Sequence, residues 1–324
     1  MQVNQCTRQL AMAFAIGLCV LTATAATPAY PTRPIRLLVP FPPGGGTDLL
    51  ARVLAEHLSG AGNQNVVVDN RAGGNTIIAS EIVAHAQPDG HTLLVQINNL
   101  TALPALSPGK RTISVNDFEP VTLVGILPHI LAVHHSFPAS SVKELIALAK
   151  KAPKKYTYAS AGIGTPVHLG GALFASMAGV ELVHVPYKGA AGYTTALLGA
   201  HVDMTFGSVP ALLTHIRKGA VRALAATTAT RIKVLPDLPT LAESGLAGYN
   251  IASWYGIFAP KGTPDRIVNQ LQAEIARAIK TKPVATRLSD YELIANTPAE
   301  FVTFLKRDAE VTTRVITQSG AKAN

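Results

Sequence analysis

Residues 40–48 read Pro-Phe-Pro-Pro-Gly-Gly-Gly-Thr-Asp and separate a predicted strand from a predicted helix. The apolar run at 35–39 is typical of a buried strand, and residues 49–58 carry an apolar stripe at helical spacing. Thr47 or Asp48 is placed to cap that helix. A helix N-terminus carries a partial positive charge, and three glycines remove the Cβ atoms that would keep a ligand from the backbone. The turn is therefore suited to an anion.

The same turn lacks the fingerprints of nucleotide-binding loops. It matches neither GxxxxGK[ST] nor GxGxxG, and no lysine follows its last glycine to reach a phosphate. Considered by itself, the stretch is equally compatible with a tight strand-to-helix connection that binds nothing.

A second glycine turn repeats the arrangement farther along the chain. Residues 160–166 (SAGIGTP) follow a strand-like run at 156–159 and precede a helix with Pro166 in its first turn and Gly179 at its end. Ligands of open α/β sheets bind beyond the carboxyl ends of the strands. Two such turns predict two α/β lobes that hold a small dianion between neutral backbone donors.

Short β-rich runs alternate with helical patterns along the chain. This alternation predicts an α/β protein with mostly parallel sheets flanked by helices. Strands are expected at 35–39, 66–68, 92–95, 156–159, 182–185, 202–206 and 222–226, and helices at 76–85, 141–151, 166–178, 194–198, 210–218 and 264–279.

Residues 1–26 are typical of a cleaved secretory signal. Arg8 supplies the positive segment, an apolar run occupies 10–21, and small residues offer cleavage after Ala25, Ala26 or Ala29. The apolar run is too short to span a bilayer, so we expect export to the periplasm. Both cysteines lie in this segment, so the exported chain is expected to have no thiol chemistry and no disulfide.

The composition argues against nucleic acid as a partner. The formal net charge is +9, but only 15% of the residues are charged and no basic run is interleaved with aromatic residues. A mildly cationic surface fits an anionic ligand, and it also fits ordinary solubility. No HExxH or other compact metal-binding pattern occurs, so neither a metal nor an organic cofactor is expected.

Several independent segments occur together in the order of one known family. They are YPTRPI at 30–35, VPFPPGGGTD at 39–48, NRAGGN at 70–75, PDGHTLL at 88–94, DFEPV at 117–121, HVPYKG at 184–189, LPDLPT at 235–240 and SWYG at 253–256. On these segments the chain resembles the tripartite tricarboxylate transporter receptors, the Bug family of periplasmic solute-binding proteins. The resemblance covers essentially the whole exported chain.

The resemblance implies the two-domain fold of periplasmic binding proteins, which closes on a ligand like a flytrap. Domain 1 would comprise residues 30–130 plus 251–324, and domain 2 residues 131–250. Crossing strands near 125–133 and 249–259 would form the hinge. The implied function is that of a monomeric receptor that binds a small carboxylate and delivers it to membrane subunits of a tripartite tricarboxylate transporter.

The resemblance also implies that the ligand lies between the two glycine turns and the strand ends beside them. The ligand-binding residues so implied are Phe41, Gly45, Gly46, Thr47, Asp48, Asn75, Gln96, Asn98, Ser160, Gly162, Gly164, Thr165, His168, Pro186, Tyr187, Gly207 and Ser208.

Two departures from the family pattern concern ligand choice. Gln96, Ile97, Asn98 and Asn99 stand where small residues are usual, and Gly207 and Ser208 follow Phe206 where an aspartate is common. Bulky amides would narrow the pocket or add hydrogen bonds. The missing aspartate would remove a partner for a ligand ammonium or repulsion of a second carboxylate. We therefore expect an organic acid that needs no amino group.

Two other functions remain open to the sequence. Ser160, His168 and Asp203 could be imagined as a hydrolytic triad, but no GxSxG elbow is present, so no catalysis is expected. A receptor that signals to a membrane sensor would need the same closure as a transport receptor, so the sequence does not separate these two roles.

Overall fold

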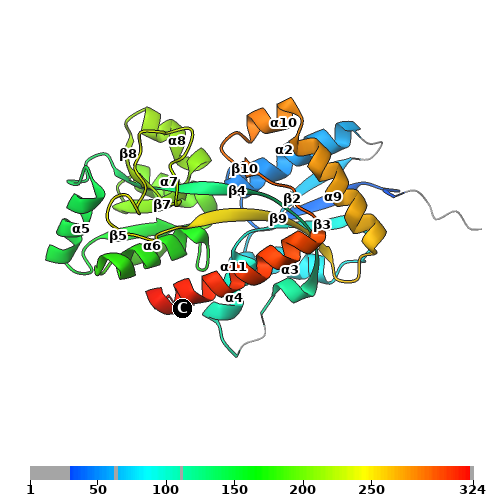
Figure 1. The fold of residues 1–324 in the computed structure, drawn as a ribbon, viewed down its shortest axis with the longest axis horizontal. Helices are drawn as coiled ribbons and strands as arrows, with labels where there is room; N and C mark the ends of the chain where they lie inside the picture. Colours follow the sequence, from blue (N-terminus) through cyan, green and yellow to red (C-terminus); the bar gives the residue numbers. More distant parts are fainter. Residues whose placement is uncertain (1–29, 62–64, 110–111, 322–324) are drawn as a thin grey trace, which may run out of the picture. The chain divides into compact units, whose positions relative to one another are not determined.

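The computed structural model describes residues 30–61, 65–109 and 112–321, and it has the α/β fold expected from the sequence (Figure 1). The predicted signal segment at 1–26 and both cysteines lie outside the described residues. Across the described ranges, every helix is too short or too polar to cross a membrane.

Strands and helices alternate through most of the chain. The strands are β1 (Ile35–Val39), β2 (Val66–Asn70), β3 (Thr92–Gln96), β4 (Phe118–His134), β5 (Thr157–Ser160), β6 (Val183–Pro186), β7 (Met204–Ser208), β8 (Val221–Ala226), β9 (Ala252–Pro260) and β10 (Glu292–Leu293). The helices are α2 (Gly46–Ala61), α3 (Ile77–Ala84), α4 (Asn99–Leu106), α5 (Val142–Lys151), α6 (Pro166–Ala178), α7 (Gly189–Leu198), α8 (Val209–Arg217), α9 (Asp265–Ile279), α10 (Lys282–Arg287) and α11 (Pro298–Ser319), with short 3-10 turns at Gly74–Thr76 and Val115–Asp117.

Two three-stranded parallel blocks form the ends of the sheet. Their strand orders are β2-β1-β3 and β6-β5-β7. The first glycine turn follows β1 and the second follows β5, and each of these strands is the middle one of its block. The middle strand is where successive crossovers leave to opposite sides, and there the loops open a crevice for a ligand.

The long strands β4 and β9 connect the two blocks. Residues 118–128 of β4 pair antiparallel with β9, and residues 129–133 pair with β7. Strand β9 in turn pairs with β3, so the hydrogen-bonded sheet continues from one block to the other (Figure 1). The segments expected to cross between the lobes, 125–133 and 249–259, overlap these two strands.

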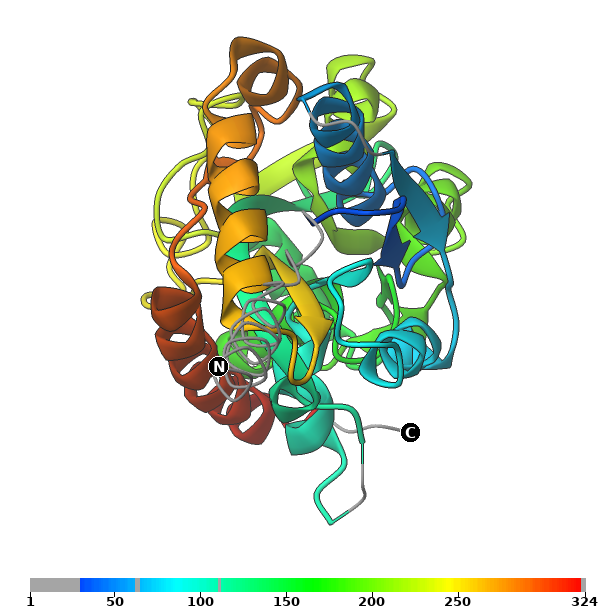
Figure 2. The ribbon, with the colours of Figure 1, turned by 90° about the vertical axis from the view of Figure 1, so that its right-hand side faces the viewer.

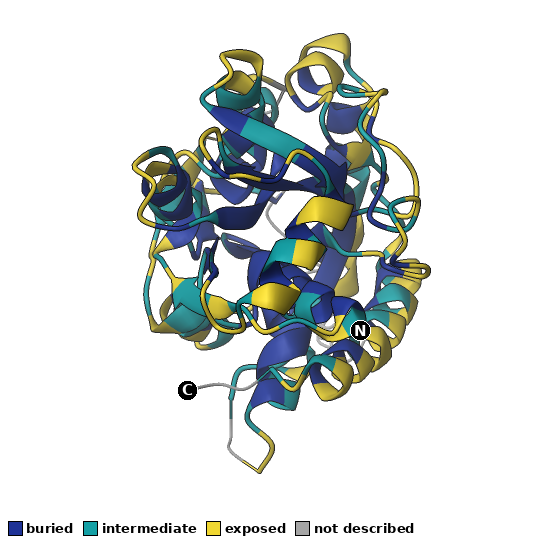
Figure 3. Cartoon of the chain, turned by 90° about the vertical axis from the view of Figure 1, so that its left-hand side faces the viewer, coloured by how far each residue is buried: buried dark blue, intermediate teal, exposed yellow. Residues whose placement is uncertain are grey.

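Helices cover both faces of the strands and bury their apolar sides. In Figure 2, α2 and α9 lie beside one another over the first block, and they are in contact. Helix α9 buries Ile267, Leu271 and Ile275 at helical spacing. Figure 3 shows the same division elsewhere, with buried strands and helices exposed on their outer faces.

The C-terminal helix α11 packs against both α4 and α6, which belong to different ends of the sheet. It begins with a capping box formed by Thr297 and Glu300, and its Phe301 is fully buried against Trp254 and Phe258.

The structure corrects two expectations about helices. Helix α7 begins at Gly189, not near residue 194. Gly192 has a poor helix propensity, but its close packing under the Tyr187 side chain compensates for it. Helix α4 was not anticipated, since Pro104 inside it reads as a helix breaker.

Candidate functional site

The two ends of the sheet meet where the first glycine turn contacts the start of α7. A Cβ atom placed on Gly45 would lie 3.3 Å from the Cβ of Ala190 in α7. A Cβ atom on Gly189, which has a positive φ of 75°, would lie 3.0 Å from Cδ of Pro42. The first glycine turn and the start of α7 are therefore in close contact, and the positive φ of Gly189 favours glycine there.

A second set of contacts lies beside the first. The Asn99 side chain donates a hydrogen bond of 3.3 Å to the carbonyl of Ile163. The Asn75 Oδ1 atom lies 3.0 Å from the position of a Cβ on Gly162. Asn75 has a left-handed φ of 56°, which asparagine adopts more readily than most residues.

A small cavity lies between the turns, with about 40 Å³ of space for water-sized molecules. That is enough for one to three waters and too little for a larger metabolite. The cavity is lined by Phe41, Gly45, Gly46, Thr47, Ile97, His129, Ala161, Thr165, Pro166, Val167, Ala190, Tyr193, Ser208, Ser253 and Tyr255.

Four helices begin at this cavity. Gly46 is the first residue of α2, Thr165 is the N-cap of α6, Ala190 is the second residue of α7, and Ser208 is the N-cap of α8. The first turns of helices leave backbone N–H groups unpaired and carry partial positive charge. The cavity therefore has a positive potential that is supplied by neutral groups.

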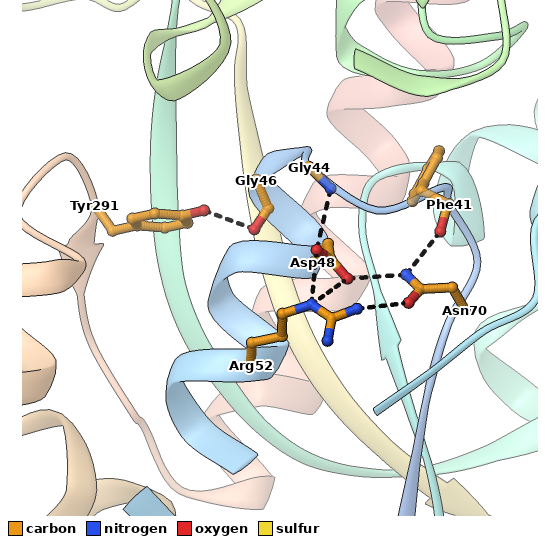
Figure 4. A network of polar contacts seen from close by, with 7 residues as sticks. All are labelled: Phe41, Gly44, Gly46, Asp48, Arg52, Asn70 and Tyr291. Carbon is orange, nitrogen blue, oxygen red and sulfur yellow. Dashed lines mark hydrogen bonds and ion pairs between the residues drawn. The ribbon is translucent and has the colours of Figure 1, made fainter. Parts of the chain in front are cut away.

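The first glycine turn is held from behind by the buried carboxylate of Asp48 (Figure 4). It accepts hydrogen bonds of 3.0 Å from the Gly44 amide, 2.9 Å from Arg52 Nε and 2.9 Å from Asn70 Nδ2. Asn70 also donates to the Phe41 carbonyl, so both ends of the turn are fixed. Burial by itself would raise the pKa of Asp48, but these hydrogen bonds outweigh it and hold the pKa below its ordinary value of 3.8.

Gly46 is enclosed by aromatic hydroxyls. The Tyr291 hydroxyl donates a hydrogen bond of 2.7 Å to the Gly46 carbonyl (Figure 4). A Cβ on Gly46 would lie 2.7 Å from the Tyr255 hydroxyl and 2.9 Å from Cδ2 of Leu127. All of these side chains are buried, so they have little room to move.

We therefore expect Gly46→Ala to lower the free energy of unfolding by about 1–3 kcal/mol, since it overpacks a buried site. Gly60→Ala is the matched control, because Gly60 is exposed near the end of the same helix and nothing lies within 4 Å of its added Cβ. The control should raise stability by up to about 1 kcal/mol. Urea denaturation of the three proteins measures both effects, and equal stability of the two variants would contradict the packing argument.

The second glycine turn rests on two imidazoles, the buried His168 and the half-buried His184. The Gly164 amide donates to Nδ1 of His168 at 3.2 Å, and Nε2 of His184 lies 2.7 Å from Ser160 Oγ. The two rings are 4.3 Å apart. Burial lowers the pKa of His168 to about 4, and burial with the neighbouring His168 lowers that of His184 to about 3. Both rings are neutral near pH 7 and act as supports for the turn.

The cavity brings together six of the residues expected from the sequence, namely Phe41, Gly45, Gly46, Thr47, Thr165 and Ser208. The others lie behind the turns or beside the cavity. Asp48 and Ser160 lie behind the turns, Asn75 lies opposite Gly162, and Gly164 lies against Leu106. His168 lies under Gly164, Pro186 pairs with Ser160, and Tyr187 lies over Gly192. Gln96, Asn98 and Gly207 lie outside the lining of the cavity.

The amides that replace small residues serve packing. Gln96 is fully buried, donates to Ser80 Oγ and accepts from the Ile97 amide, and Asn98 accepts from the Trp254 amide. Ile97 alone of this group lines the cavity. Gly207 lies under the ring of Tyr193. A Cβ atom added to Gly207 would lie 2.7 Å from Cε2 of Tyr193, so a side chain there would displace the tyrosine.

Four polar lining residues were missed, namely His129, Tyr193, Ser253 and Tyr255. They come from β4, α7 and β9, far from the glycine turns in sequence. The available signals were His129, a polar residue within the apolar run of β4, and the SWYG segment at 253–256, which contains Ser253 and Tyr255.

The imagined hydrolytic triad is not assembled. Ser160 Oγ is buried and contacts His184, not His168. The Asp203 carboxylate accepts from the Thr157 amide and hydroxyl. Among the described residues, no three histidine, cysteine or acidic side chains are grouped to hold a metal ion.

Comparison with known proteins gives the family. Residues 50–320 match the family model of the tripartite tricarboxylate transporter family receptors, TctC. The chain belongs to this family. It is 35% identical to protein BugT of Bordetella pertussis over an alignment of 324 residues, and this alignment covers 98% of each chain.

Solved structures of similar sequence share the fold. R. palustris Rpa4515 with adipate superimposes with a TM-score of 0.86 at 34% identity, covering 90% of this chain and 99% of the other. MatC from Rhodopseudomonas palustris with bound malate gives a TM-score of 0.83 at 30% identity, covering 89% and 100%. Periplasmic binding protein BugD gives a TM-score of 0.85 at 33% identity, covering 91% of this chain and 100% of the other.

Proposed function

We propose that this receptor binds a small carboxylate between its two glycine turns and delivers it to a tripartite tricarboxylate transporter. The observation that carries the proposal is the cavity at which four helices begin. Backbone N–H groups and hydroxyls can neutralise a carboxylate without a cationic side chain. The adipate and malate complexes of the two relatives support the same ligand class.

The lining favours an acid without an amino group. Among the described residues that line the cavity, none is aspartate or glutamate. An ammonium group beside the helix N-termini would therefore lack a counter-ion and would meet like partial charge. The tight packing of Gly207 against Tyr193 keeps an acidic side chain from that position.

The proposed mechanism is a shift of population from an open to a closed state. One domain, residues 30–130 plus 251–324, would bind the acid first, and the other, residues 131–250, would then close on it. Strands β4 and β9 would flex between them. Contacts such as Asn99 to Ile163 would form only on closure, and the transporter would distinguish the closed state.

The remaining parts of the proposal follow from the family. The receptor works in the periplasm as a monomer, after removal of residues 1–26, and it catalyses no reaction. Its partners are the carboxylate and the membrane subunits of the transporter.

Calorimetric titration of the purified protein tests the ligand class. Adipate, malate and succinate are expected to bind at least about tenfold more tightly than aspartate and glutamate, which equals about 1.4 kcal/mol. Tighter binding of the two amino acids would overturn the preference, and binding of none of these acids would overturn the proposed function.

A further inference from the structure

His129 is a buried histidine in the wall of the cavity, only 2% exposed. It lies where β4 passes from β9 to β7, opposite Ser208 in the register. The amide of Thr227 donates to the His129 carbonyl at 3.0 Å, and the Thr227 hydroxyl, 3.1 Å from that oxygen, lies 2.7 Å from the Ile251 carbonyl. The backbone is therefore fixed, and the imidazole stays at the cavity.

The hydrogen bonds of His129 have a defined direction. Its Nδ1 lies 2.9 Å from the carbonyl oxygen of Phe206, which can only accept, so Nδ1 carries the hydrogen. Its Nε2 lies 2.8 Å from Ser253 Oγ. In a neutral imidazole Nε2 is then an acceptor, and Ser253 must donate its hydrogen to the ring.

Because Ser253 donates its hydrogen to His129, the lone pairs of Ser253 Oγ face the cavity. Ser253 lines the cavity, but its hydrogen points away to His129, so a carboxylate arriving there meets an acceptor. A proton on Nε2 would reverse the bond. The imidazolium would donate to Ser253 Oγ, and the Ser253 hydrogen would be free to donate to the carboxylate.

We infer that His129 is a positioning residue of the proposed carboxylate site, which takes up a proton on Nε2 as the anion binds and passes a hydrogen bond to it through Ser253. A buffer acid supplies the proton, one N–H bond forms, and no bond of the ligand breaks. The inference rests on the proposed function.

Of the titratable groups on described residues that face the cavity, His129 is the one that can take up a proton when an anion binds. Tyr193 from α7 and Tyr255 from β9 also line the cavity, but burial raises the pKa of both hydroxyls, while hydrogen bonds to serine and threonine hydroxyls oppose the shift. From α2, Thr47 lines the cavity, and the Asp48 carboxylate is paired with Arg52 behind the turn. From β7, the Ser208 hydroxyl contacts Tyr193.

The free receptor keeps the imidazole neutral. Burial lowers the pKa of His129 to about 4, against the opposing hydrogen bond to Phe206. A carboxylate about 5 Å away, at an effective dielectric constant of about 20, raises an imidazole pKa by about two units. The bound state then holds more protons, so affinity rises as the pH falls through that range.

Calorimetry in buffers of different ionisation enthalpy measures the proton directly. With adipate or malate at about pH 6, the observed enthalpy should vary with the buffer, with a slope of about half a proton per ligand, and the slope should vanish at about pH 8. His129→Gln should lose the slope at about pH 6. His91→Gln is the matched control, a buried histidine at the start of β3 outside the cavity lining, and it should keep the slope.

Binding without any buffer dependence in the native receptor would overturn this inference and leave the proposed function intact. A slope that persists in His129→Gln would overturn the assignment to that residue. If His129→Gln does not fold, imidazole ¹⁵N spectra of the native receptor decide. At about pH 6, saturation with the acid should convert about half of one neutral imidazole population to imidazolium, and unchanged spectra would count against the inference.

Discussion

Ser208→Asp is expected to lower the affinity for adipate or malate by about a thousandfold, because two like charges about 4 Å apart repel by about 4 kcal/mol at an effective dielectric constant of about 20. Ser208 is the N-cap of α8 and lines the cavity, so the new carboxylate would occupy the positive potential intended for the ligand. Aspartate is also a favourable N-cap, and the Tyr193 hydroxyl beside Ser208 can donate to it.

Ser208→Asn is the matched control. Its side chain has the shape of aspartate, caps helices as well, and carries no charge. Calorimetry should show the asparagine variant within about tenfold of the native affinity, and thermal melts should show both variants folded. Equal affinity of the two variants would mean that the carboxylate does not bind at the start of α8.

Asp48→Ala is expected to lower the free energy of unfolding by about 1.5–3 kcal/mol, because it removes a buried carboxylate that accepts three charge-assisted hydrogen bonds. The Gly44 amide and the Asn70 side chain would lose their partner, and Arg52 would lose its ion pair. Asp265→Ala is the matched control, since Asp265 is exposed in the first turn of α9 and should cost at most about 1 kcal/mol.

The effect of Asp48→Ala should depend on pH. Because folding holds the pKa of Asp48 below its ordinary value of 3.8, the carboxylate contributes its stability above that value. The contribution is lost as the pH falls through the lower pKa of the folded state. Urea denaturation should therefore show a constant difference between native and variant proteins near pH 7 and a shrinking one below about pH 4. A difference that grows toward low pH would contradict this account.

The sequence predicted the glycine turns well because their chemistry is local. A strand, a run of glycines and a capped helix occupy consecutive residues, so Gly46 and Thr165, which line the cavity, could be singled out without knowledge of the fold. The same locality explains the correct capping boundary at Ser141, whose side chain accepts from the Glu144 amide.

The rest of the lining depends on contacts between distant segments. His129 and Ser253 are brought together by the pairing of β4 with β9, which no local pattern determines. Conversely, Gln96 and Asn98 looked suited to a ligand, but Ser80 and the Ile97 amide pair with both ends of the Gln96 amide, and the Trp254 amide donates to the Asn98 oxygen. The type of a residue does not show whether its polar group is hydrogen-bonded within the folded protein or is free to bind a ligand.

The insertion of β9 between β3 and β4 has a consequence for incomplete chains. A polypeptide that ends after β8, through an early stop or proteolysis, contains every strand of the β6-β5-β7 block but leaves β3 and the first part of β4 without their common neighbour. Both would then expose long apolar edges of the kind that recruit other chains into aggregates. Quality control of a truncated product would thus have to act on the N-terminal half of the molecule, although the missing residues are C-terminal.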